Sequence, residues 1–107
     1  MNLIKETSAA TFELDVLNSD NPVLVHFGKT SSAPCRQIAP LLQDVAQKYQ
    51  GDLSVVRLDV DAEAPLAAKY GIKAVPTLIF FKYGANVDQL VGAPTSATLQ
   101  HFIDANL

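Results

Sequence analysis

The sequence predicts a single α/β domain built around a mixed β-sheet with helices on both faces. Strand-like and helix-like segments alternate along most of its 107 residues, and a short turn joins the last two strand-like segments. Strands separated by helices imply parallel neighbours with right-handed crossovers, whereas a tight turn implies an antiparallel pair. A chain of this length forms one hydrophobic core, and 49% of its residues are hydrophobic. We therefore expect one domain over residues 1–107.

The N-terminal part of the chain predicts a short strand followed by a helix. Residues 3–5 are expected to form an edge strand. Residues 8–18 are expected to be helical, because Ala9, Phe12 and Val16 are spaced so that they share one helical face.

A buried strand and a long helix come next. Residues 23–27 are mostly apolar and lack polar alternation, which is typical of a strand covered on both faces. The strongest helical periodicity follows, starting near Pro34 and ending at Gly51. Pro40 lies inside this helix and is expected to kink it. The apolar face of the helix consists of Ile38, Leu41, Leu42, Val45, Ala46 and Tyr49.

The second half of the chain predicts three further strands and two helices. Residues 53–60 form a valine- and leucine-rich strand, and residues 64–70 form a short helix. Residues 77–82 and 87–91 flank a glycine-containing turn and predict a β-hairpin. Residues 95–106 predict the last helix. The expected order is therefore β-α-β-α-β-α-β-β-α.

Composition and motif content argue against several classes of function. The net charge of -3 argues against nucleic-acid binding, which requires a basic surface. The apolar runs are shorter than the roughly 20 residues of a membrane span. The N-terminus does not resemble a signal peptide, so we expect a cytoplasmic protein. One cysteine and two distant histidines form no metal motif, and the glycines do not cluster into a phosphate-binding loop, so we expect neither a metal nor a cofactor.

Several segments together resemble the thioredoxin family. They are residues 22–40, which include the stretch APCRQIAP, and residues 70–78, 91–93 and 102–107. The resemblance covers essentially the whole chain and implies a thioredoxin fold, with a five-stranded mixed sheet flanked by four helices. It also implies a cis peptide bond before Pro76 and a substrate groove beside Cys35.

The sequence departs from the family pattern at its most important positions. Ser32 stands where the family has its attacking cysteine, whereas the partner cysteine is kept as Cys35. Gly28 replaces a tryptophan that is usual in the family. His26 stands where thioredoxins usually have a buried aspartate, and Arg57 stands where they commonly have a lysine. A natural loss of the dithiol and an engineered Cys→Ser change both fit Ser32.

These departures change the chemistry that the resemblance implies, which is protein-disulfide reduction. Ser32 forms no stable bond to sulfur, so the standard dithiol cycle is blocked. Cys35 can still form mixed disulfides as a monothiol, if an external thiol such as glutathione resolves them. A helix N-terminus favours the thiolate, but burial opposes it. We expect His26 and Arg57 to tune the thiol, although a buried histidine is more often a core residue.

The resemblance also predicts partners, namely proteins or peptides with disulfides or thiols, and a thioredoxin reductase. The expected substrate-binding residues are Ala33, Pro34, Ala74, Val75, Pro76, Gly92 and Ala93. An alternative is a redox-inactive module that binds an extended peptide in this groove through main-chain hydrogen bonds.

Overall fold

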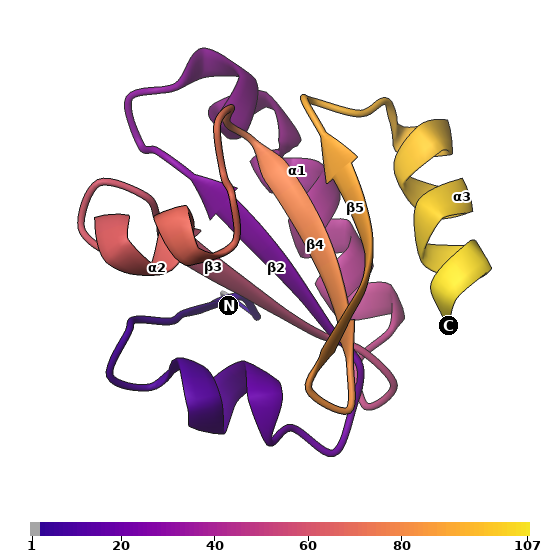
Figure 1. Ribbon diagram of the computed structural model, residues 1–107. Helices are drawn as coiled ribbons and strands as arrows, with labels where there is room; N and C mark the ends of the chain where they lie inside the picture. The colour runs from indigo at the N-terminus through magenta and orange to yellow at the C-terminus, as the bar shows by residue number, and fades with distance from the viewer. Residues whose placement is uncertain (1–2) are drawn as a thin grey trace.

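The computed structural model describes residues 3–107, which form a five-stranded mixed sheet in the order β1-β3-β2-β4-β5 (Figure 1). The strands are β1 (Lys5–Glu6), β2 (Val23–Gly28), β3 (Ser54–Asp59), β4 (Thr77–Lys82) and β5 (Ala85–Val91). β3 pairs in parallel with β1 and β2, whereas β4 is antiparallel to both β2 and β5. This arrangement confirms the predicted mixed sheet and makes β2 its central strand.

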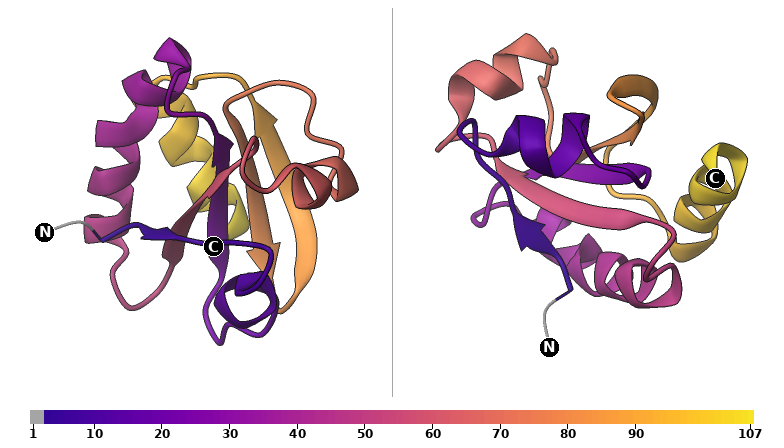
Figure 2. Two further views of the ribbon diagram at one scale, coloured as in Figure 1. Left: turned by 90° about the vertical axis from the view of Figure 1, so that its left-hand side faces the viewer. Right: turned by 90° about the horizontal axis from the view of Figure 1, so that it is seen from below.

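Helices cover both faces of the sheet (Figure 2). They are η1 (Glu13–Leu17), α1 (Ala33–Lys48), α2 (Ala64–Lys69) and α3 (Ser96–Asn106). α1 and α3 pack on one face, and η1 and α2 pack on the other. Within residues 3–107, no helix has both the length and the apolar character that crossing a membrane requires.

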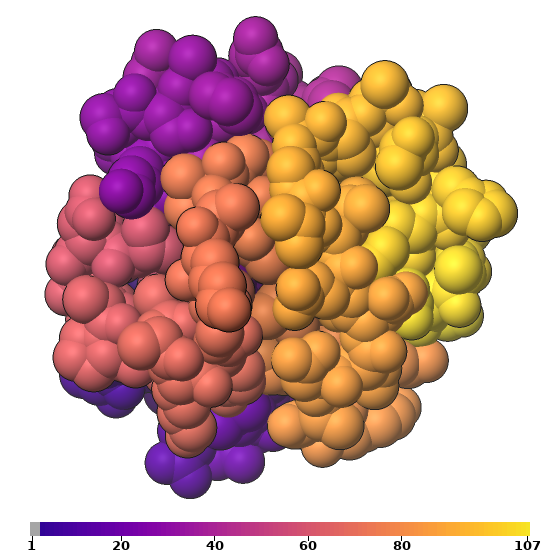
Figure 3. Space-filling view, turned by 45° about the horizontal axis from the view of Figure 1, so that its top comes forward, coloured from indigo at the N-terminus to yellow at the C-terminus, as the bar shows by residue number. Residues whose placement is uncertain are grey.

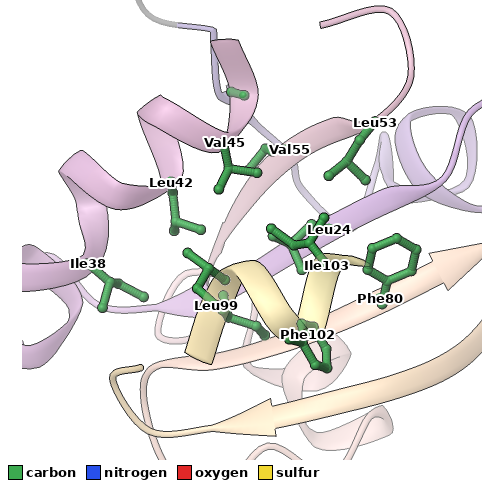
Figure 4. Packing of buried hydrophobic residues seen from close by; sticks show 12 residues of the cluster. Leu24, Ile38, Leu42, Val45, Leu53, Val55, Phe80, Leu99, Phe102 and Ile103 are labelled. Atoms are coloured by element: carbon green, nitrogen blue, oxygen red, sulfur yellow. The ribbon is translucent and has the colours of Figure 1, made fainter. Parts of the chain in front are cut away.

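The central strand β2 separates two hydrophobic clusters. Leu24 packs with α1 and α3 (Figure 4), whereas Val25 and Phe27 pack with η1 and the residues around α2. Every residue of β2 is buried, as the absence of polar alternation predicted. Since successive side chains of a strand alternate between faces, His26 and Gly28 lie on the same face as Leu24, toward α1.

The first helical segment is shorter than the predicted helix over residues 8–18. Regular winding is confined to η1, where the Asn18 N–H donates to the Glu13 carbonyl at 2.8 Å, a bond across five residues. The preceding residues form a turn in which the Ser8 N–H donates to Thr11 Oγ1 at 3.3 Å. Side-chain hydroxyls that bond to the backbone in this way compete with helix formation.

The predicted hairpin is tighter than the sequence indicated. Lys82 pairs with Ala85, so a two-residue turn of Tyr83 and Gly84 joins β4 to β5. Both turn residues have positive φ, at 50° and 82°, which suits the right-handed twist of the flanking strands. β5 therefore begins at Ala85 rather than at the predicted residue 87.

Candidate active site

The start of α1 is organised by Ser32, the residue at the expected position of the attacking cysteine. Ser32 is the N-cap of α1, and its Oγ accepts a hydrogen bond from the Cys35 N–H at 3.3 Å. Pro34 lies in the first turn, where its missing N–H is not needed. Serine is among the preferred N-cap residues, so this position has a structural role that needs no thiol.

Cys35 lies in the first turn of α1 and is buried, with 3% of its surface exposed. It lines a surface cavity of about 290 Å³ between the start of α1 and strands β2 and β3. His26 and Arg57 line the same cavity, so the structure brings together three of the four residues predicted to carry the chemistry. Among residues 3–107, no group of three or more His, Cys, Asp or Glu side chains is placed to hold a metal ion.

His26 is buried next to this cavity, with 4% of its surface exposed. Its Nε2 has no hydrogen-bond partner among the described residues. Burial, together with the nearby positive charge of Arg57, lowers the pKa of His26 from 6.5 to about 4. The imidazole is therefore neutral at neutral pH, and a thiolate–imidazolium ion pair with Cys35 is disfavoured there.

Gly28 leaves space that the His26 and Cys35 side chains border. A Cβ added at Gly28 would lie 2.6 Å from His26 Nε2 and 3.1 Å from Cys35 Sγ. The first of these distances is shorter than any real contact of this kind, so a larger residue at position 28 requires His26 to move. The sequence marked Gly28 only as a departure from the family. The two-residue spacing from His26 was the signal that the two share a face.

Arg57 lies at the edge of the cavity and is held by two partners. Its Nη1 donates to both carboxylate oxygens of Glu6, at 2.8 and 3.2 Å, and its Nη2 donates to Thr30 Oγ1 at 3.3 Å. The pairing of β1 with β3 places Glu6 directly beside Arg57. Sequence reasoning did not identify Glu6 or Thr30, because their contacts depend on how the chain folds.

Arg36 is a further basic residue at this cavity. It is exposed, and its Nη1 donates to the Thr30 carbonyl at 2.9 Å. Lys29 also lines the cavity. The sequence gave no signal for this basic cluster, because Lys29, Arg36 and Arg57 belong to three different segments.

The predicted substrate-binding residues come from the start of α1 and from the loops before β4 and after β5, which gather at one end of the sheet (Figure 3). The Val75–Pro76 peptide bond is cis, as the resemblance implied. The Gly92 N–H donates to the Pro76 carbonyl at 2.8 Å, which holds two groove segments together. The exposed members of the predicted set are Ala33, Pro34, Ala74 and Ala93.

Comparisons with known proteins agree with this architecture. The family model named Thioredoxin matches residues 3–105. The chain belongs to the thioredoxin family. It is 39% identical to thioredoxin 1 of a Nostoc species and 40% identical to the thioredoxin of a Synechocystis species, in both cases over the full length of both chains. It is also 42% identical to the thioredoxin of Pseudomonas aeruginosa, over 97% of this chain and 96% of that one.

Membership of this family fixes two further points. The five-stranded sheet with helices on both faces is a thioredoxin fold. The family is one of thiol–disulfide oxidoreductases, so Cys35 is placed in a scaffold associated with sulfur chemistry.

Proposed function

We propose that this protein carries out thiol–disulfide exchange through Cys35 alone. The Cys35 thiolate attacks one sulfur of a substrate disulfide, the new mixed disulfide forms, and the other sulfur leaves as a thiolate that takes up a proton. An external thiol such as glutathione then attacks the Cys35 sulfur, which releases the reduced substrate and leaves a mixed disulfide between this thiol and Cys35. A second external thiol attacks this bond, so that Cys35 is freed and an oxidised small disulfide leaves. The dithiol cycle is closed because Ser32 provides a hydroxyl, which caps α1.

One observation carries this proposal: the buried sulfur of Cys35 still borders a surface cavity. Its position in the first turn of α1 supports the same chemistry, because the positive end of a helix stabilises negative charge that develops on the reacting sulfur atoms. The first turn of α1 contains no acidic residue that would weaken this effect.

The groove around Pro76 is the proposed docking site for protein or peptide substrates. An extended segment could pair there through main-chain hydrogen bonds, with Ala74 and Ala93 exposed at its edges. A reducing cytosol would keep Cys35 as a thiol and supply small thiols. A thioredoxin reductase remains a candidate partner, with the mixed disulfide as the bond that it would reduce.

The test is the reaction of the native protein with an aromatic disulfide reagent between pH 5 and pH 9. We expect modification of one thiol per chain while the fold stays intact, at a rate that rises with pH as the thiolate forms. A Cys35→Ser variant controls for non-specific reaction. Reaction only after unfolding would reject thiol exchange and leave a peptide-binding module as the remaining function.

A further inference from the structure

We propose that the cavity bordered by Cys35 and His26 binds small thiols and disulfides that carry carboxylates. This inference rests on the proposed function and names the class of external thiol that resolves the mixed disulfide. The cavity is lined from α1 by Cys35 and Arg36, from β2 by His26, from β3 by Arg57, and by Lys29. Its volume of about 290 Å³ is at the lower end of the range for small-molecule sites.

The cavity is separate from the predicted protein-binding groove. Among the described residues that line it, none comes from the segments around Pro76 or Gly92. Its lining includes Ile4 and Glu6, on the side of the sheet edge formed by β1. The cavity therefore gives a small molecule a way to the sulfur of Cys35 that does not pass through that groove.

An unpartnered polar atom at the cavity points to a ligand. His26 Nε2 is buried and makes no hydrogen bond within the described part of the chain, a state that carries a free-energy cost. The same atom and Cys35 Sγ lie 2.6 Å and 3.1 Å from the position of a Cβ on Gly28, so both border one small region of the structure. A small thiol or disulfide seated against Cys35 would offer polar groups within reach of this nitrogen.

Two of the three basic residues at the cavity are partly neutralised. Arg57 is bound to Glu6, and Lys29 lies 3.6 Å from Asp61. Asp59 is close enough to both cations for them to lower the pKa of its carboxyl, after the larger effect of the Ala62 and Asp61 N–H groups. Neither Asp59 nor Asp61 lines the cavity.

Arg36 supplies the charge that selects for carboxylates. Among residues 3–107, no Asp or Glu carboxylate lies within 4 Å of its guanidinium. Its bond to the Thr30 carbonyl uses one Nη1 hydrogen and leaves other donors for a ligand. The N-terminal end of α1 adds a partial positive charge at the same place. Among the described residues, the cavity lining has three basic side chains and one acidic side chain, Glu6, whereas the protein as a whole has a net charge of -3.

The reaction in the cavity is balanced without another reactant. The Cys35 thiolate attacks one sulfur of the small disulfide, so that one S–S bond forms and one breaks. The second sulfur leaves as a thiolate and takes up a proton equivalent to the one that Cys35 released. In the reverse direction, a small thiol attacks a mixed disulfide at Cys35 and regenerates the free thiol.

The test compares three disulfides of different charge: anionic oxidised glutathione, uncharged bis(2-hydroxyethyl) disulfide and cationic cystamine. Formation of the Cys35 adduct is followed by intact-protein mass spectrometry. Each native rate is divided by the rate for the urea-unfolded protein, which removes differences in intrinsic reactivity. Arg36→Gln removes the unpaired charge, and Lys48→Gln at the other end of α1 is the matched control.

We expect the normalised rates to fall in the order anionic, uncharged, cationic. Arg36→Gln should lower the rate with oxidised glutathione about three- to tenfold and raise the rate with cystamine, and Lys48→Gln should change neither. An order independent of charge, or equal effects of the two variants, would overturn the inference and leave the proposed function standing. Native protein that reacts with none of the three disulfides would instead reject the proposed function.

Discussion

His26 Nε2 and Cys35 Sγ approach the same side of Gly28, at 2.6 Å and 3.1 Å from where a Cβ would stand. This relationship links three of the positions that the sequence analysis compared with the thioredoxin pattern. A large imidazole at position 26 fits because position 28 has no side chain. The two positions are therefore coupled, because His26 occupies space that a side chain at position 28 would need.

Replacing Gly28 with alanine should destabilise the fold through its contact with His26. The added Cβ forces a movement in a packed region, and overpacking of this kind costs about 1–3 kcal/mol. In a His26→Ala background the same change should cost much less, because the contacting ring is gone. Urea unfolding of the four proteins in this double-mutant cycle measures the coupling. Additive costs would mean that the ring moves away freely.

The sequence predicted the general architecture well because its signals are local. The uninterrupted apolar character of β2 predicted burial on both faces, and the resemblance predicted the cis bond before Pro76. Element ends were less accurate where side chains bond to the backbone, as Thr11 does ahead of η1.

The cavity was beyond sequence reasoning, for a physical reason. Arg36, Arg57 and Glu6 come from three segments and meet only after β1 pairs with β3 and α1 packs on the sheet. The spacing of these residues along the chain therefore does not predict that they lie close together. The sequence also could not predict that His26 Nε2 has no hydrogen-bond partner among the described residues. Whether a buried polar atom forms a hydrogen bond depends on all of its neighbours in the fold.

Acidification should destabilise the protein over a pH range that is set by the pKa of His26 in the folded and unfolded states. Its pKa is about 4 in the folded state against 6.5 in a model peptide, so the unfolded state binds more protons between these values. Stability is therefore full above about pH 6.5 and falls as the pH decreases toward 4, by roughly 3 kcal/mol. Urea unfolding at half-unit pH steps measures the slope.

The matched variant for this slope is His26→Leu, which has a similar size and no titratable group. It should lose most of the pH dependence between pH 4 and pH 6.5. At pH 8 it should be at least as stable as the parent, because it removes a buried nitrogen that has no partner in the described structure. An unchanged slope in this variant would show that other groups control the acid response.

The capping role of Ser32 can be measured apart from any redox chemistry. Ser32→Ala removes the acceptor for the Cys35 N–H and should lower the free energy of unfolding by about 1 kcal/mol. Ser31→Ala is the control, because Ser31 is an exposed neighbour outside the cap. The comparison requires chemical denaturation of the reduced proteins. Equal stability of the two variants would contradict the assigned cap.

Replacing Gly84 in the hairpin turn with alanine should destabilise the protein more than the same replacement at Gly51, which follows α1. Gly84 has φ +82°, and a Cβ there would lie 3.1 Å from the Leu17 carbonyl oxygen. Gly84→Ala should cost about 2–3 kcal/mol, from left-handed strain and this contact. Gly51→Ala is the control, with φ +93° and nothing within 4 Å of the added Cβ. Its cost of about 1 kcal/mol should reflect strain alone.

Adding a second thiol should change how Cys35 is released from its mixed disulfide with the substrate. Ser32→Cys places a sulfur at the N-cap, three residues from Cys35, where it can attack a mixed disulfide within the same molecule. We expect the pre-reduced variant to release reduced substrate in a single turnover at a rate independent of the glutathione concentration, because an intramolecular thiol has a high effective concentration. The variant is left with a disulfide between the introduced cysteine and Cys35, which glutathione must reduce before the next turnover. The parent protein should show turnover that rises with glutathione. The variant should also be less stable by about 1 kcal/mol, since cysteine is a poorer cap than serine.

The Ser32→Cys experiment tests whether Ser32 alone prevents a dithiol cycle or whether the surroundings of Cys35 also prevent it. If the pre-reduced variant releases reduced substrate in a single turnover without added glutathione, the scaffold supports dithiol chemistry, and Ser32 alone limits the parent. If the variant stays dependent on glutathione, the neutral His26 beside Cys35 becomes the next position to change. His26→Asp combined with Ser32→Cys would then introduce the acidic residue usual in the family. Recovery only in this double variant would place the block in the surroundings of Cys35 as well as at position 32.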